Sequence, residues 1–153
     1  MNWLFDLFTN PFLMVSLGSW FIAQLLKVII DFIIHKTWNW ERLFGDGGMP
    51  SGHSATVASL ATYSALACGT ASFQFAVTTI LAVIVCHDAM GVRLETGKQA
   101  IVLNDLMEII DMLTTEKLPE VKLKEFVGHT PIQVLAGFLV GILNAIFMYN
   151  VVF

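Results

Sequence analysis

A short segment at residues 47–55 carries the chemical groups that a phosphate-binding site requires. It reads Gly-Gly-Met-Pro-Ser-Gly-His-Ser-Ala and lies between two apolar stretches. Its glycines let backbone amides approach an anion closely, and a helix that begins near Ser51 would direct its free N–H groups and positive dipole end toward that anion. Ser51 adds a hydroxyl group, and His53 can carry a proton near neutral pH. The alternative is an ordinary turn followed by a helix cap.

A second histidine, His129, comes just before the last apolar stretch of the chain. We expect His53 and His129 to lie at the same end of the fold, together with the cations Lys27, Arg42 and Arg93. A nucleophilic imidazole, a proton donor and several cations are the parts that phosphoryl transfer through a phosphohistidine needs. A single histidine at a loop end is more often structural, so the catalytic interpretation depends on both.

The composition indicates a membrane protein. Hydrophobic residues make up 56% of the 153 residues and charged residues only 13%, and the mean hydropathy is +0.73. A soluble domain averages roughly 45–50% apolar and about 25% charged residues. The net charge of −4 and the lack of a basic tract argue against a nucleic-acid partner. No Cys/His spacing resembles a metal site, and both cysteines are expected to be free, buried thiols.

The pattern of apolar stretches predicts an all-α fold, a polytopic membrane helical bundle that forms a single domain over residues 1–153. The first stretch is long enough, at about 1.5 Å per residue, to cross a hydrocarbon core of about 30 Å. The second is rich in Ala, Ser and Thr, which suits close helix packing in a bilayer. The four spanning helices are expected at residues 12–34, 53–68, 73–90 and 132–153.

A polar insertion at residues 91–128 separates the third and fourth expected spans. Asp105, Glu108 and Asp111 recur every three residues there, with apolar residues between them, so residues 101–113 are expected to form an amphipathic helix. This helix would lie on the membrane or over a site, or would pack on the protein's own loops. The sequence leaves these alternatives open.

The basic residues fall in segments at one expected membrane face. The N-terminus, the turn between the second and third spans, and the C-terminus carry no Lys or Arg. The positive-inside rule then places both termini outside and the site loops in the cytoplasm of a multi-pass protein of the cell membrane. Gly137 and Gly141 have the small-xxx-small spacing that would also permit a homodimer.

Polar residues at two helix ends are further candidates. Gln24, Lys27 and Asp31 form one stripe on the first span, and an ionisable group within a membrane helix is a functional candidate. The alternative is a Lys27–Asp31 ion pair that only solubilises the helix end. Arg93 follows the third span, and its guanidinium geometry matches phosphate oxygens. Its neighbours Asp88 and Lys98 are supporting candidates, or else parts of a solvated helix end.

These segments together resemble a known family. Residues 50–53 and 128–137 resemble the second and third signature motifs of the type 2 phosphatidic acid phosphatase superfamily, which is related to acid phosphatases and vanadium-dependent haloperoxidases. Residues 47–54, with 88–93 and 97–100, resemble its small divergent branch in bacteria and plants. The resemblance covers nearly the whole chain. It implies a helical bundle with the site at the bundle end and a reaction that needs no metal and no cofactor.

The resemblance also implies roles for individual residues. His129 matches the histidine that attacks phosphorus, and His53 matches the histidine that protonates the leaving oxygen. Ser51 and the Gly52 amide match phosphate ligands. Lys27 resembles the lysine of the first motif.

The chain departs from the family pattern in its arginines. The arginine that normally follows the first-motif lysine is missing, and Arg42 is the expected substitute. Leu123 stands where the third motif normally has an arginine, six residues before His129. We therefore expect a split motif, in which Arg93 supplies this arginine and the insertion lies between Arg93 and His129.

The largest departure is Gln133, which stands where the family has an acid four residues after the nucleophilic histidine. A carboxylate orients the imidazole and stabilises its cation, whereas Gln brings no charge. Asp88 is the alternative source of that charge.

Two functions remain open on this basis. The first is a membrane phosphatase that hydrolyses a lipid phosphate or diphosphate through a phosphohistidine. The second is a catalytically weak or inactive membrane protein that binds an anionic head group, inorganic phosphate or a partner, and Gln133 and the displaced arginine favour it. Membrane lipids are expected partners in both cases. A transporter is disfavoured because the polar groups gather at one face.

Overall fold

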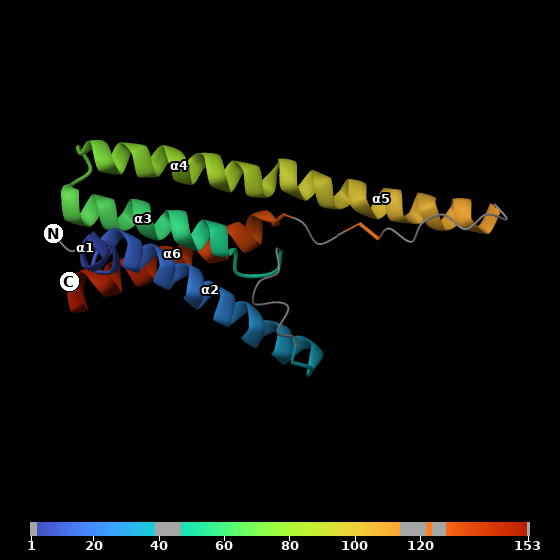
Figure 1. Cartoon of the computed structure of the whole chain (residues 1–153), viewed down its shortest axis with the longest axis horizontal. Helices are drawn as coiled ribbons and strands as arrows, with labels where there is room; N and C mark the ends of the chain where they lie inside the picture. Colours follow the sequence, from blue (N-terminus) through green and yellow to red (C-terminus); the bar gives the residue numbers. More distant parts are fainter. Residues whose placement is uncertain (1–2, 39–46, 114–121, 124–127, 153) are drawn as a thin grey trace.

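The computed structural model is all-helical over the part of the chain it describes, residues 3–38, 47–113, 122–123 and 128–152. Helices α2, α3, α4 and α6 form a bundle, and both chain termini lie at one end of it (Figure 1). The helices are α1 (Trp3–Phe8), α2 (Pro11–His35), α3 (Gly52–Cys68), α4 (Phe73–Met90), α5 (Val92–Leu113) and α6 (Pro131–Val151). The predicted all-α helical bundle is therefore confirmed, and the long helices lie close to the expected bounds.

Local sequence signals explain where the helices begin and end. The side chain of Asn10 accepts hydrogen bonds from the first backbone N–H groups of α2, and Ser51 and Ser72 cap α3 and α4 in the same way. Lys36 adopts a left-handed conformation and ends α2. Cys68, which we expected to be buried, is exposed because it is the last residue of α3, where the chain leaves the bundle.

Helix α3 is the central helix of the bundle and packs against α2, α4 and α6. Its small polar side chains Ser54, Ser59 and Ser64 are fully buried between these neighbours. The helices long and apolar enough to cross a membrane are Pro11–His35, the joined α4–α5 stretch Phe73–Leu113, and Pro131–Val151. With 17 residues, α3 is shorter and less apolar than these helices. Its low hydropathy suits a helix that meets protein on most sides.

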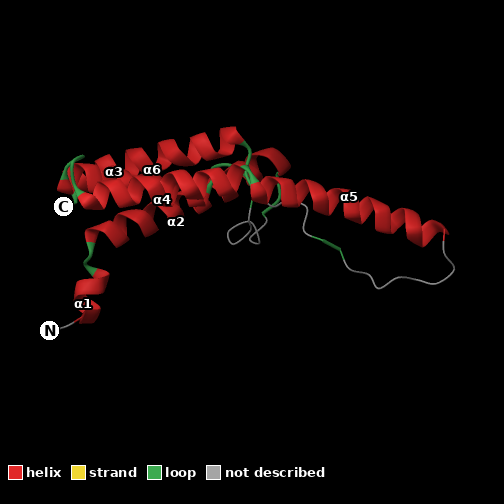
Figure 2. Ribbon diagram, turned by 90° about the horizontal axis from the view of Figure 1, so that it is seen from above, coloured by secondary structure: helices red, strands yellow, loops and turns green. Residues whose placement is uncertain are grey.

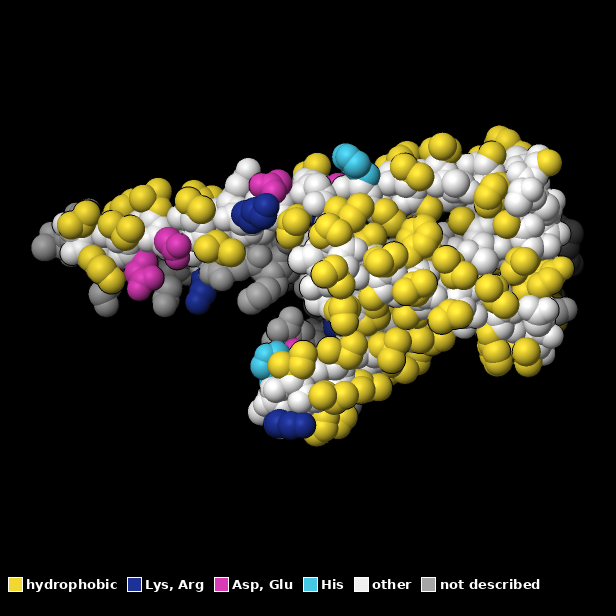
Figure 3. Space-filling view, turned by 180° about the vertical axis from the view of Figure 1, so that it is seen from behind, with side chains coloured by type: hydrophobic (Ala, Val, Ile, Leu, Met, Phe, Trp, Pro, Cys, Tyr) yellow, Lys and Arg dark blue, Asp and Glu magenta, His cyan; other side chains and the backbone are white. Residues whose placement is uncertain are grey.

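The outer surface of the bundle is apolar. Phe73 is 80% exposed, and Leu143 on α6 is 66% exposed. Hydrophobic side chains spread over the outside of the bundle on the face seen in Figure 3. Soluble monomers rarely expose contiguous apolar areas of this kind. The chain is therefore a membrane protein, with lipid hydrocarbon as the solvent of this surface.

Helix α6 approaches α3 closely because two glycines of α6 lie in the contact. A Cβ atom on Gly137 would lie 2.2 Å from the Ser51 carbonyl oxygen, and one on Gly141 would lie 2.4 Å from the Ala55 carbonyl oxygen. Any side chain at these positions would push the helices apart. The small-xxx-small spacing, which we interpreted as permitting a homodimer, is thus used inside the chain.

Helix α5 does not fold back over the bundle. It begins at Val92, directly after Gly91, and runs on from the end of α4 well beyond the other helices (Figures 1 and 2). The Asn104 side chain donates a hydrogen bond to the Leu123 carbonyl oxygen and accepts one from the Leu123 N–H, each 3.0 Å long. This contact supports the alternative in which the helix packs on the protein's own loops. Because α5 runs away from the bundle, the alternative in which the helix covers the site is wrong.

Substitution of the α6 glycines should destabilise the bundle selectively. Gly137→Ala or Gly141→Ala should lower the free energy of unfolding by about 1–3 kcal/mol, because the added methyl group overlaps the α3 backbone. Gly18→Ala in α2 is the matched control, since its Cβ would meet nothing closer than 3.8 Å. Thermal unfolding in detergent measures the effect. Equal stability of Gly137→Ala and Gly18→Ala would contradict the proposed packing.

Candidate functional site

Three helix ends meet at the end of the bundle that is remote from the chain termini. The Ser51 N–H donates a 3.0 Å hydrogen bond to the Gln133 carbonyl oxygen, which joins the start of α3 to the first turn of α6. The His129 N–H donates a 3.0 Å hydrogen bond to the Ala89 carbonyl oxygen at the end of α4. These backbone contacts fix the start of α3, which carries His53, and the loop that carries His129.

The rings of His53 and His129 lie next to each other. Their centroids are 5.9 Å apart, and the ring planes are tilted by 51°. His129 is only 3% exposed, whereas His53 is exposed at the first turn of α3. Because a reacting group must lie about 3 Å from both nucleophile and proton donor, one phosphoryl group can contact both rings at this separation.

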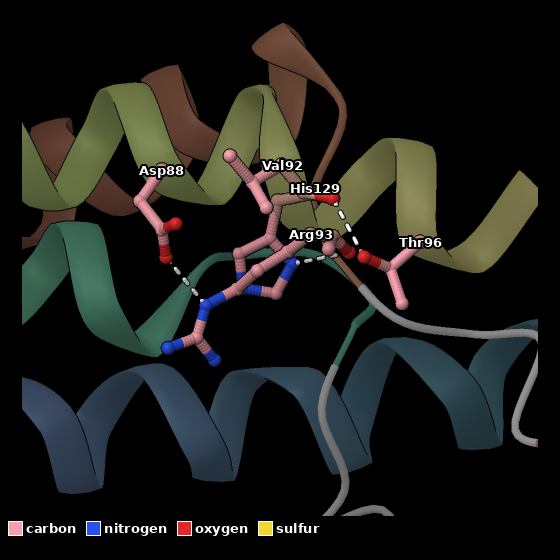
Figure 4. A network of polar contacts seen from close by, with 6 residues as sticks. Asp88, Val92, Arg93, Thr96 and His129 are labelled. Carbon is pink, nitrogen blue, oxygen red and sulfur yellow. Dashed lines mark hydrogen bonds and ion pairs between the residues drawn. The ribbon is translucent and has the colours of Figure 1, made fainter.

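The imidazole of His129 is oriented by a backbone carbonyl. Its Nδ1 lies 2.9 Å from the Gly128 carbonyl oxygen (Figure 4). Since a carbonyl can only accept, Nδ1 must carry the hydrogen and donate. In the neutral ring, Nε2 then carries the lone pair that a nucleophile needs.

Gln133 has a different role from the acid it replaces. Its Oε1 accepts a 3.0 Å hydrogen bond from the Thr130 N–H, and the Thr130 hydroxyl accepts one from the Gln133 N–H. This reciprocal arrangement is a capping box at the start of α6. The Gln133 side chain therefore caps a helix, and a neutral carbonyl, that of Gly128, orients His129.

Arg93 and His129 lie in adjoining segments although the insertion separates them in sequence. A Cβ on Gly128 would lie 2.3 Å from the Leu94 nitrogen, so only glycine fits where this loop passes the start of α5. The Arg93 Nε donates a 2.7 Å hydrogen bond to the Asp88 carboxylate (Figure 4). This arrangement is compatible with the expected split motif, and it pairs the Asp88 charge with Arg93.

The remaining candidates of the phosphate site lie around the start of α3. Ser51 is fully buried, and its Oγ accepts hydrogen bonds from the Ser54 N–H and the Ser54 hydroxyl, so its own O–H remains to donate. The Lys27 side chain is only 5% exposed and passes beside Gly48, where its Cδ would lie 3.4 Å from an added Cβ. Lys27, Ser51 and the Gly52 amide therefore border the same loop.

The expected site residue Lys98 is not brought to this point. The Lys98 ammonium pairs with Glu95 at 2.7 Å on the exposed surface of α5, further along the helix than Arg93. Arg42 lies outside the described residues. No group of three or more His, Cys, Asp or Glu residues within the described ranges could hold a metal ion.

Trp20, which the sequence did not single out, and Gln24, which belongs to the expected polar stripe, are neighbours of the site. The Trp20 indole and the Gln24 amide both contact Gly52, at 3.3 Å and 3.8 Å from the point where its Cβ would be. Both residues lie on the same face of α2 as Lys27, because Trp20 precedes Lys27 by seven positions and Gln24 precedes it by three. The stripe that contains Gln24 was visible in the sequence, but its contact with α3 depends on how the helices cross.

The fold and this site define a class, a polytopic helical membrane protein with paired histidines at one end of the bundle. The chain matches the model of the divergent PAP2 family over residues 8–144 and belongs to that family. It is 44% identical over 149 residues to the "uncharacterized membrane protein YuiD" of Bacillus subtilis strain 168, which covers 90% of this chain and 93% of that protein. No solved structure matches the chain.

Gln133 offers a direct check of the capping assignment. Gln133→Ala should lower the free energy of unfolding by about 0.5–1.5 kcal/mol, because the Thr130 N–H loses its acceptor. Gln133→Glu should retain the stability of the wild type, since Glu completes a capping box equally well. Thermal unfolding of the three purified proteins measures this order. A stable Gln133→Ala variant would rule out the capping role.

Proposed function

We propose that the protein is a membrane phosphatase that hydrolyses a lipid phosphate or diphosphate through a phosphohistidine. The observation that carries the proposal is the 5.9 Å separation of the His53 and His129 rings, which come from different helices. The Nδ1 contact with Gly128 supports the proposal further, because it leaves Nε2 of His129 as the attacking atom.

In the first step, the Nε2 lone pair of His129 attacks phosphorus and the bond between phosphorus and the leaving oxygen breaks. His53 donates a proton to that oxygen, so the lipid leaves as an alcohol or, from a diphosphate, as a monophosphate. In the second step, water attacks the phosphohistidine, His53 takes its proton, and inorganic phosphate is released. The charge that develops on the phosphoryl oxygens would be stabilised by Lys27, Arg93 and the first-turn amides of α3.

An apolar groove favours a substrate with a hydrocarbon tail. The groove has a volume of about 570 Å³ and lies between α3 and α4. Alanines of α3, Phe75 and Val83 of α4, and Phe138 of α6 line it. His87 and Met90 mark its end nearest the site, since the adjacent Ala89 holds the His129 backbone. A lipid phosphate could thus keep its tail in hydrocarbon while its head group reaches the histidines.

The alternative is a protein that binds an anionic head group without turnover. Two side chains that were expected to contact the imidazole are engaged elsewhere, because Gln133 caps α6 and Asp88 pairs with Arg93. Neither side chain would then stabilise an imidazolium that forms during phosphoryl transfer.

Phosphate release separates the two functions. The purified protein should release phosphate, without added metal, from a prenyl or glycerol lipid phosphate. His129→Ala should abolish release, because it removes the nucleophile, and His53→Ala should lower the rate by about 10²–10⁴-fold. His35→Ala is the matched control and should retain activity, since His35 is exposed at the end of α2 and outside the pair. Full activity in His129→Ala would refute the proposed nucleophile.

We further propose that the site faces the cytoplasm of the cell and that both termini face outward. An impermeant maleimide applied to intact cells should then label wild-type Cys68, which is exposed at the end of α3 opposite the site, but not Cys68→Ser. Lys122→Cys in the Cys68→Ser background should stay unlabelled until the cells are broken. The reverse pattern of labelling would overturn this orientation.

A further inference from the structure

Gln24 has a buried hydrogen-bond acceptor without a partner at the candidate phosphate site. Its side chain is only 6% exposed, and its Oε1 makes no hydrogen bond. Among the buried side-chain oxygens and nitrogens of the described residues, only Thr79 Oγ1 shares this state. Buried polar groups are almost always paired, so an exception beside a candidate site indicates a ligand that supplies the missing donor.

The Gln24 amide lies against the start of α3. Its Cδ is 3.8 Å from the position that a Cβ on Gly52 would take. Lys27 follows one turn later on the same face of α2 and borders Gly48 of the same loop. An anion at the first turn of α3 would therefore lie between the helix amides and this face of α2.

Several hydrogen-bond donors lie around this position. They include the Lys27 ammonium, the Gly52 N–H at the start of α3, and the Ser51 hydroxyl, whose oxygen already accepts two hydrogen bonds. A ligand that accepts from these donors needs several acceptor oxygens. To satisfy Gln24 Oε1 as well, it needs one O–H group.

We propose that Gln24 Oε1 accepts a hydrogen bond from the P–OH group of a bound phosphate or phosphate monoester, and that this contact selects such groups over sulfate and phosphodiesters. A phosphate monoester has a second pKa of about 6, so its monoanion keeps one proton on a phosphoryl oxygen near that pH. Sulfate and phosphodiesters carry no such proton. The inference rests on the proposed function only in requiring a phosphoryl group at this site.

Anion binding tests the inference without requiring turnover. Calorimetry of the purified protein in detergent at pH 6 should show inorganic phosphate binding at least about tenfold more tightly than sulfate, as expected for one hydrogen bond to a charged ligand. Gln24→Met keeps the length of the side chain but removes the acceptor. It should weaken the binding of phosphate alone, so that the affinities for phosphate and sulfate differ by no more than about threefold. Gln74→Met, at an exposed glutamine near the start of α4, should keep the wild-type ratio.

A second variant guards against misfolding of the first. Gln24→Glu keeps an acceptor, so it should retain the preference for phosphate over sulfate even though its charge weakens both anions. An unchanged ratio in folded Gln24→Met would overturn the role of Gln24 and leave the proposed function standing. No phosphate binding by the wild type would overturn both.

Competition then identifies the source of the phosphoryl group. Displacement of phosphate by micelles that contain phosphatidic acid, a monoester, but not by micelles that contain phosphatidylglycerol, a diester, would assign the contact to a lipid head group. Retained phosphate selectivity without displacement by either lipid would assign it to free phosphate. Equal displacement by both lipids would overturn the selection that we propose.

Discussion

The close contact of α6 with α3 is the constraint on which the rest of the structure depends. Inside a bilayer, helices gain little from hiding apolar surface, so they associate through close packing and interhelical hydrogen bonds. The absent side chains of Gly137 and Gly141 let the α6 backbone reach the carbonyl groups of α3. That approach puts the Gln133 carbonyl within reach of the Ser51 N–H and brings His129 beside His53. The site geometry is thus a product of helix packing as much as of the residues that bear the chemistry.

Much of this fold could be predicted from the sequence, because apolar stretches and capping residues are local signals. Asn10, Ser51 and Ser72 begin helices as their residue types predict. The direction of α5 could not be predicted, since amphipathic periodicity does not say what a helix packs against. The pairing of His53 with His129 was expected because both precede or begin helices at the same end of the fold, and the family resemblance added their roles. The Gly128 carbonyl was missed because every residue has one, and only the fold shows which carbonyl faces an imidazole.

The site separates two tasks that a carboxylate usually performs together. A carboxylate beside a histidine fixes the ring and also stabilises the positive charge that it gains. Here the Gly128 carbonyl fixes the His129 ring, and it brings only a dipole. The Asp88 carboxylate pairs with the Arg93 guanidinium, and this ion pair holds the guanidinium near the start of α5. The ring of His129 is therefore oriented in this chain, whereas in the proposed mechanism the stabilisation of its charge would have to come from groups other than a carboxylate bonded to it.

The two ends of the chain leave the bundle together, at the pole opposite the histidines (Figure 1). Gly69 and the short turn between α3 and α4 lie at that pole as well, because α3 runs from the site toward it. Fusion partners or surface anchors can therefore be attached at either terminus without crowding the entrance to the site. For an apolar bundle with little polar surface of its own, this gives a handle for immobilisation or imaging at the end opposite the two histidines.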